Sequence, residues 1–175
     1  MKLYEIGQES KGIAEVYVDM DGVLADFFGA WSKMSGVDHY KDIGNVEAAL
    51  DMIRQHPTFW IDLPVLPNAG KLLGFIKKNF GHYKICSSPL AGDNRSEPQK
   101  REWVKKHLGN FPPNEVIITH NKPAYATQAD GTQNILIDDF GKNIAAWNAA
   151  GGIGVKHKDN KLDRTFGALK DHLSA

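Results

Sequence analysis

Short apolar runs alternate along the chain with segments whose apolar residues recur every three or four positions. The runs are rich in β-branched and aromatic residues and predict strands, whereas the recurring spacing predicts helices. The predicted strands cover roughly residues 15–18, 83–86, 116–118, 135–137 and 153–155. Helices are expected between them and after the last one. This alternation predicts an α/β fold, a three-layer Rossmann-like parallel sheet with helices on both faces.

One region interrupts this alternation. Residues 27–63 contain two stretches of helical spacing, at Phe27–Trp31 and Val46–Ile53, and prolines follow the segment. We therefore predict a small helical cap over residues 27–63, inserted after the first strand. The core would comprise residues 1–26 and 64–175.

Several polar residues are placed to begin helices. Asn45 and Asn68 precede two of the predicted helices and could cap them. Ser96 with Gln99 resembles a capping box.

Side chains with useful chemistry follow the first four predicted strands. In chain order they are Asp19 with Asp21, Ser87, Lys122, and Asp138 with Asp139. The carboxyl ends of parallel strands meet at one edge, where open α/β sheets bind ligands. Clustered carboxylates repel one another and need a cation or a shared proton. Gly22, directly after Asp21, would permit the tight turn that such a site needs.

This set of groups meets the needs of phosphoryl transfer. The Asp19 carboxylate could attack phosphorus, and Asp21 could protonate the leaving oxygen and later activate water. A hydroxyl and an ammonium could hold the phosphoryl oxygens. Magnesium takes oxygen ligands and bridges them to phosphate. The sequence therefore predicts a Mg²⁺-dependent phosphoryl-transfer site.

Each group taken alone has a plainer interpretation. Asp19 and Asp21 could form a solvated Asp-Gly turn, and Ser87 could be a turn residue. Lys122 could be a solvated lysine, and the acidic pair at 138–139 could cap the next helix. The joint order of the groups favours the catalytic interpretation.

Composition excludes several other classes. The chain of 175 residues has 21 Lys and Arg against 21 Asp and Glu, so its formal net charge is zero. No basic surplus suggests long nucleic acid or a membrane surface as partner. No apolar run is long enough for a membrane span or a signal peptide, and a cytoplasmic location is expected. The single cysteine, Cys86, excludes an internal disulfide and lies in an apolar strand, which predicts an inert buried thiol.

The motifs resemble those of the haloacid dehalogenase (HAD) superfamily of phosphohydrolases: Asp-x-Asp after the first strand, Ser or Thr after the second, a Lys, and a later acidic pair. The resemblance implies a HAD-like core in which Asp19 is the nucleophile and Asp21 the general acid/base. It also implies phosphate binding by Ser87, Ser88 and Lys122. Magnesium would be held by Asp19, Asp21 and one of Asp138 or Asp139.

A narrower resemblance is to the 5′(3′)-deoxyribonucleotidases. The segments that carry it are 19–27, 59–67, 85–89, 100–109 and 136–139. In that family the aromatic residues matching Phe27, Phe59 and Trp60 line the nucleoside pocket; ordinary packing between cap and core is the alternative. Ser87 replaces the family's usual Thr. Residues 90–98 depart from the family's specificity loop, and 93–95 could contact substrate or form a polar turn.

The resemblance thus implies a magnesium-dependent hydrolase of deoxyribonucleoside 5′- or 3′-monophosphates that works through an aspartyl-phosphate. Its partner would be a small-molecule nucleotide, and a homodimer is compatible with the family. The alternatives are a HAD phosphatase for another small phosphomonoester or a nucleic-acid terminal phosphate, a phospho-accepting signalling receiver, and an inactive binding module. In a receiver the reactive Asp would follow a middle strand.

Overall fold

The computed structural model describes residues 12–173 of the chain. Within them, five parallel strands form one sheet in the order β3-β2-β1-β4-β5. The strands are β1 (Val16–Val18), β2 (Lys84–Ser87), β3 (Glu115–Ile118), β4 (Ile135–Asp138) and β5 (Ile153–Lys156). The predicted α/β fold with a parallel sheet is confirmed.

Helices occupy the connections between these strands. The described residues form α1 (Phe27–Met34), α2 (Val46–Gln55), α3 (Ala69–Phe80), α4 (Ser96–His107), α5 (Gly141–Ala149) and α6 (Leu162–Lys170). Short 3₁₀ turns are η1 (Tyr40–Asp42), η2 (Lys122–Tyr125) and η3 (Asp159–Lys161). Residues 1–11 and 174–175 of the predicted core lie outside the described residues.

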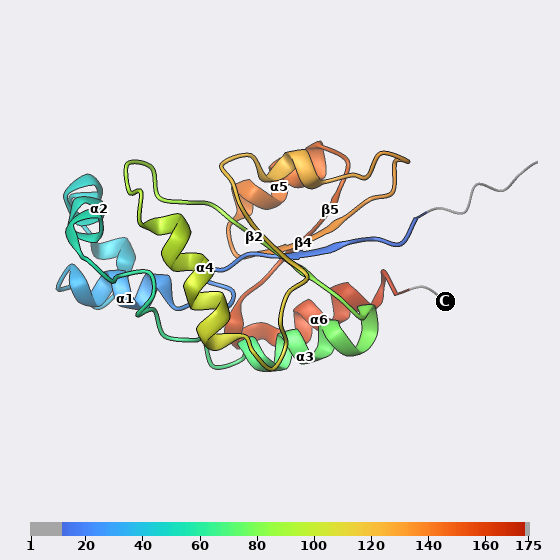
Figure 1. Ribbon diagram of the computed structural model, residues 1–175, viewed down its shortest axis with the longest axis horizontal. Helices are drawn as coiled ribbons and strands as arrows, with labels where there is room; N and C mark the ends of the chain where they lie inside the picture. Colours follow the sequence, from blue (N-terminus) through green and yellow to red (C-terminus); the bar gives the residue numbers. More distant parts are fainter. Residues whose placement is uncertain (1–11, 174–175) are drawn as a thin grey trace, which may run out of the picture.

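The sheet is the middle of three layers (Figure 1), with α5 on one face and α3 and α6 on the other. Side chains of β1 alternate between the two faces. Val16 and Val18 belong to the core beneath α3 and α6, whereas Tyr17 packs edge-on against Trp147 of α5 at 5.4 Å between ring centroids. All three β1 residues are buried, as expected for a central strand of a sheet covered on both faces.

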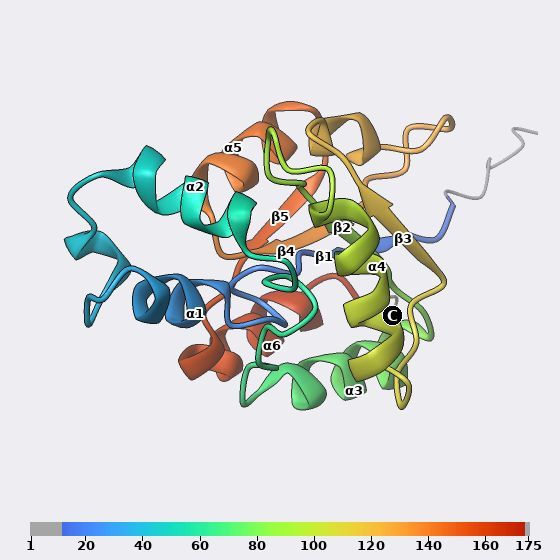
Figure 2. The ribbon, with the colours of Figure 1, turned by 60° about the vertical axis from the view of Figure 1, so that its left-hand side comes forward.

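Strand β1 lies at the centre of the sheet, between β2 and β4 (Figure 2). Its last residue, Val18, pairs in register with Ile85 of β2 and Ile137 of β4. The residues that follow these three positions therefore emerge at one edge of the sheet.

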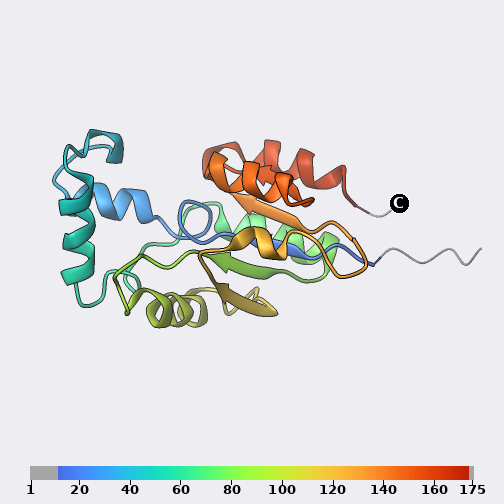
Figure 3. The same ribbon diagram turned by 90° about the horizontal axis from the view of Figure 1, so that it is seen from above.

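Residues 27–63 carry α1, η1 and α2, which lie at one end of the molecule beyond the carboxyl ends of the strands (Figure 3). The two ends of this segment are held together. The Asp26 N–H donates to the Pro64 carbonyl and the Leu66 N–H donates to the Leu24 carbonyl, each at 2.8 Å. The chain thus leaves and rejoins the core at one place, while the division into core and cap stays a prediction.

The predicted helix caps were right in one case and wrong in two. Asn45 caps α2 through its side chain. Asn68 makes no cap; its amide donates to the Asp159 carbonyl at 2.9 Å. Ser96 is already helical, and its hydroxyl accepts from the Leu90 N–H at 2.9 Å, so the capping box does not form. In both cases a backbone group outside the helix, 91 positions from Asn68 and 6 from Ser96, takes the side chain from its capping role.

Candidate active site

Three carboxylates lie together at the carboxyl edge of the sheet. Asp19 follows β1, Asp138 ends the neighbouring β4, and Asp139 comes next. Oxygens from all three lie within 4.8 Å of one another. Asp19 and Asp138 are buried, so this is not a solvated turn. The ends of the first and fourth predicted strands therefore meet as expected.

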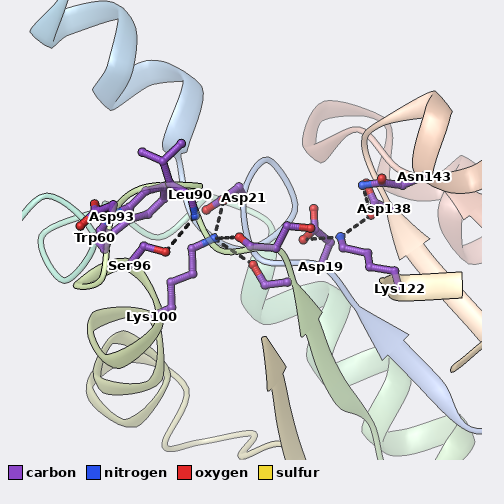
Figure 4. A network of polar contacts seen from close by, with 12 residues as sticks. Asp19, Asp21, Trp60, Leu90, Asp93, Ser96, Lys100, Lys122, Asp138 and Asn143 are labelled. Carbon is purple, nitrogen blue, oxygen red and sulfur yellow. Dashed lines mark hydrogen bonds and ion pairs between the residues drawn. The ribbon is translucent and has the colours of Figure 1, made fainter. Parts of the chain in front are cut away.

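Lys122, the first residue of η2, offsets part of this negative charge. Its buried ammonium donates to Asp19 Oδ1 at 2.9 Å and to Asp138 Oδ2 at 2.7 Å (Figure 4). Burial alone lowers the pKa of Lys122, but the two carboxylates outweigh it and the net shift is upward. Lys122 is therefore a charged part of the site and not a solvated loop lysine.

The two residues of the acidic pair have different surroundings. Asp138 accepts from the Phe140 N–H at 2.9 Å, from the Asn143 amide at 3.0 Å and from Lys122. Its side chain thus organises the turn into α5, although the residue in the cap position is Phe140. Among residues 12–173, no side chain donates a hydrogen bond to the Asp139 carboxylate. Asp139 is therefore the member of the pair with oxygens free for a ligand.

Burial and mutual repulsion raise the pKa values of the Asp19 and Asp139 carboxyl groups. Burial chiefly raises the pKa of Asp19 to about 7, against the lowering effect of Lys122 and with a further rise from Asp138. Burial also raises the pKa of Asp139 to about 8, helped by the charges of Asp19 and Asp138. Three carboxylates against one ammonium leave a negative surplus, and a divalent cation fits such a donor set.

Gly22 allows the loop after β1 to approach this cluster. Its φ is +80°, a left-handed conformation that favours glycine. A Cβ at this position would overlap Oδ2 of Asp139. The predicted tight turn is confirmed, and Gly22 lets the backbone that carries Asp21 lie directly against the Asp139 carboxylate.

A second cluster forms around Lys100 of α4, on the other side of the β1 loop (Figure 4). Its ammonium donates to Asp21 Oδ2 at 2.7 Å, to the Ser87 hydroxyl at 3.0 Å and to the Ser88 carbonyl at 2.8 Å. Ser87 at the end of β2 and Asp21 therefore share the Lys100 ammonium, while phosphate binding by Ser87 stays a prediction. Ser88 contributes its backbone carbonyl, and its predicted phosphate contact stays a prediction. The other oxygen of Asp21, Oδ1, is buried without a hydrogen-bond partner among residues 12–173.

Lys100 was not among the residues predicted for the site. It is fully buried, and it shares the buried face of α4 with Ser96, Trp103 and Val104. The available signal is a lysine on the apolar face of a helix, at four residues after Ser96 and three before Trp103. Because a buried lysine needs partners, this position predicts an ion pair.

The three predicted substrate-binding aromatics do come together. The rings of Phe27 and Trp60 stack at 5.6 Å, and Phe59 packs edge-on against both. Phe59 and Trp60 are 4% and 3% exposed, so most of their surface is used in packing. The Lys100 ammonium lies 4.6 Å from the centroid of the Trp60 ring. The aromatic group therefore borders the Lys100 cluster, and its contact with a nucleoside stays a prediction.

The loop before α4 is fastened to this aromatic group. Asp93 is buried and accepts from the Trp60 indole N–H at 2.8 Å and from the Arg95 N–H at 3.1 Å. Asp93 thus has the contacts of a polar turn, the plainer of its two interpretations.

Cys86 has no place in this chemistry. It is fully buried, and burial raises the pKa of its thiol to about 12. Its side chain packs on the α5 face of the sheet with Tyr17 and Leu136. This agrees with the prediction of an inert thiol.

The sheet order and the acidic cluster at the strand ends are those of a HAD-like fold. Two solved structures share the fold. One is a hydrolase from Streptococcus pneumoniae, with 14% identity, a TM-score of 0.56 and coverage of 89% of this chain and 100% of that one. The other is a HAD family hydrolase from Deinococcus radiodurans with bound phosphate and sodium, with 15% identity, a TM-score of 0.57 and coverage of 94% and 99%.

Sequence comparison gives the family. Residues 12–166 match the model of the 5′ nucleotidase, deoxy (pyrimidine), cytosolic type C protein family, so the chain belongs to that family. A Bordetella pertussis protein named "Putative 5'(3')-deoxyribonucleotidase" is 30% identical over 71% of this chain and 73% of its own length. A protein of the same name from Vibrio phage KVP40 is 29% identical over 74% of this chain and 68% of its own. The chain is thus a phosphatase of the nucleotidase type, as the motifs predicted.

No helix within residues 12–173 has the length and apolarity that crossing a membrane requires. The description of the family includes the word cytosolic. The cytoplasmic location of this chain stays a prediction.

Proposed function

We propose that the protein is a magnesium-dependent phosphatase of deoxyribonucleoside monophosphates that works through a phosphorylated Asp19. The observation that carries the proposal is the arrangement around Asp19, whose carboxylate pairs with the Lys122 ammonium at 2.9 Å and lies within 4.8 Å of an Asp139 oxygen. Asp21, two residues on, pairs with Lys100 beside Ser87. Membership of the nucleotidase family supports this assignment and argues against a signalling receiver or an inactive module.

The residues present fit a divalent cation. Asp19 and Asp139 would hold it through carboxylate oxygens and Asp21 through its backbone carbonyl, while Asp138, which already accepts three hydrogen bonds, would orient Lys122 and Asn143. The raised pKa values of Asp19 and Asp139 are those of buried carboxylates that outnumber the one ammonium beside them. When bound, the ion would supply positive charge to the transferring phosphoryl oxygens and keep both carboxylates ionised.

In the first half of the reaction, an Asp19 oxygen would attack phosphorus and the bond from phosphorus to the ester oxygen would break. Asp21 would give its proton to that leaving oxygen. In the second half, Asp21 would take a proton from water as the water oxygen attacks phosphorus, and the bond to Asp19 would break. The ammonium groups of Lys122 and Lys100 and the Ser87 hydroxyl would stabilise the charge that develops on the phosphoryl oxygens.

The substrate is proposed from the aromatic group and the relatives. Phe27, Phe59 and Trp60 lie beside the Lys100 cluster, and a base could pack against Phe27, the half-buried member of the three. Base stacking on an aromatic ring contributes on the order of 1–3 kcal/mol in single-strand binding. Both relatives carry a 5′(3′)-deoxyribonucleotidase name. A small nucleotide is therefore the proposed partner, and a homodimer stays a prediction.

The test is a substrate panel assayed with the purified protein and Mg²⁺. We expect deoxyribonucleoside monophosphates to be hydrolysed faster than sugar phosphates, and Asp19→Asn to lower kcat by at least roughly a thousandfold. The matched control is Asp171→Asn, at an exposed position after α6. Undiminished hydrolysis by Asp19→Asn would refute the mechanism, and a preference for sugar phosphates would refute the substrate class.

A further inference from the structure

A hollow lined only by cationic side chains lies at the end of β5. Its volume is about 180 Å³, and its lining residues are Lys156, Lys158, Lys161 and Arg164. They come from β5, the turn after it, η3 and the first turn of α6. All four side chains are exposed. The formal net charge of the chain is zero, so this is a local surplus of positive charge.

No carboxylate lines this hollow. Among residues 12–173, none of its four cations forms an ion pair. The nearby acids, Asp159 and Asp163, line a neighbouring hollow, to which Lys161 and Arg164 also contribute. The Asp159 carboxylate is engaged there by the Asn68 N–H at 3.0 Å. Within the described residues none of the four cations is thus paired with a carboxylate, and Lys156 and Lys158 do not line the hollow that holds the two acids.

The hollow lies on the same edge of the sheet as the active site. Lys156 is the register partner of Asp138 on the neighbouring strand. A Cβ added to Gly141, two residues after Asp139, would lie 3.6 Å from the Lys156 ammonium. Strand β5 is two strands from β1, which at the usual spacing of parallel strands is roughly 10 Å. One small ligand could therefore reach from Asp19 to the cations.

We propose that these four cations form a second phosphate-binding subsite, so that the preferred substrate carries two phosphate groups. One phosphate would be placed at Asp19 and the other among the four cations. Lysine and arginine side chains recognise phosphate oxygens through charge-assisted hydrogen bonds. The second phosphate could belong to a nucleoside 3′,5′-bisphosphate or be the phosphodiester of a short oligonucleotide with a terminal phosphate. This inference rests on the proposed function and narrows its substrate class.

The experiment compares a charge reversal in the hollow with an equal reversal elsewhere. The test variant is Lys158→Glu with Arg164→Glu; a Glu in the first turn of α6 suits the helix dipole, so folding should survive. The control is Lys78→Glu with Lys170→Glu, two exposed positions in the last turns of α3 and α6. KM is measured for thymidine 5′-monophosphate, thymidine 3′,5′-bisphosphate and a 5′-phosphorylated dinucleotide.

The quantity compared is the ratio of KM for a two-phosphate substrate to KM for the monophosphate. We expect this ratio to be at least about tenfold higher in the test variant than in wild type. The control should leave that ratio unchanged. The substrate that responds, bisphosphate or dinucleotide, identifies the source of the second phosphate. An unchanged ratio in the test variant, or an equal change in the control, would overturn the subsite.

A binding measurement separates this proposal from the proposed function. Calorimetry with Asp19→Asn, with and without the charge reversal, gives the affinity for thymidine 3′,5′-bisphosphate without turnover. If wild type hydrolyses no nucleotide, the proposed function fails. Weaker binding after the charge reversal would still support the subsite, and unchanged binding would overturn it.

Discussion

Two lysines, Lys122 and Lys100, reach the site from opposite sides. They differ in which parts of the fold hold them and in how deeply their carboxylate partners are buried. The Lys122 cluster consists of Lys122, Asp19 and Asp138, all close to strand ends. The Lys100 cluster consists of Lys100, Asp21, Ser87 and Trp60, which join a helix, the β1 loop, β2 and the 27–63 segment. The sheet alone positions the first cluster, whereas the second depends on how residues 27–63 pack.

Exposure of the carboxylate partners differs as well. The side chains of Asp19 and Asp138 are 8% and 0% exposed, whereas that of Asp21 is 23% exposed. If Lys122 is lost, two buried carboxylates remain without their cation. If Lys100 is lost, Asp21 can still be hydrated. The comparison therefore predicts that loss of Lys122 lowers the stability of the fold more than loss of Lys100 does. Loss of Lys100 should act mainly on catalysis.

The largest expected effect on stability is that of Lys122→Met, measured without Mg²⁺. Removing one partner of a buried ion pair costs roughly 3–5 kcal/mol, because the remaining charge stays buried and unpaired. We expect a loss of this size in urea unfolding at neutral pH. Lys142→Met, at an exposed position in α5, is the control. A loss no greater than in the control would mean that the sheet edge does not need this ammonium.

Lys100→Met should cost less stability and still damage catalysis. We expect a loss of roughly 2–3 kcal/mol, because the Asp21 carboxylate can turn to water. General acid–base catalysis typically contributes at least about a hundredfold, and kcat should fall by this order because Asp21 loses its orienting partner. Urea unfolding and steady-state kinetics measure the two effects. A greater stability loss than in Lys122→Met would reverse the ranking of the two clusters.

The same contrast explains what the sequence alone could predict. Asp19, Ser87 and Asp138 directly follow or end strands, and parallel topology brings strand ends to one edge without any knowledge of side-chain packing. Lys122 comes a few residues after β3, so the same argument applied to it. The fold and these strand-end positions, which belong to both clusters, therefore followed from periodicity and chain order.

Lys100 could not be placed by that argument, since it lies in the middle of a helix. Its contacts with Asp21 and Trp60 span 79 and 40 positions of the sequence. Local pattern says only that a lysine on an apolar face must be paired, and not with which group. The failed cap at Asn68 has the same cause, because its side chain is engaged by the Asp159 carbonyl 91 positions away, whereas Ser96 is engaged by the nearby Leu90 N–H.

A smaller effect is expected from Trp60→Phe, which tests how the 27–63 segment is joined to the Lys100 cluster. Phenylalanine keeps an aromatic ring near Lys100 but removes the indole N–H that donates to Asp93. The unsatisfied buried carboxylate should cost about 1–2 kcal/mol in urea unfolding. Asp93→Ala should remove most of that penalty in the double variant. Additive losses would show that the two residues are not coupled.

Taken over a single pH unit, the dependence of stability on pH without metal is also among the small effects. Folding raises the pKa values of Asp19 and Asp139 to about 7 and about 8, whereas an unfolded Asp titrates near 3.9. The folded state therefore binds more protons above about pH 4, and its stability falls as pH rises towards about 8. Between about pH 7 and about pH 8, each proton that the folded state releases lowers the free energy of unfolding by at most about 1.4 kcal/mol.

Urea unfolding at several pH values measures this slope, and Asp139→Asn should flatten it by removing one of the two titrating groups. Mg²⁺ should act in the opposite sense. Metal ligands must be deprotonated, so the stabilisation by Mg²⁺ should grow over the same interval in which the metal-free protein weakens. A metal-free stability that is constant or rises from about pH 5 to about pH 8 would contradict the negative surplus at the Lys122 cluster. The two clusters would then differ in position and not in charge balance.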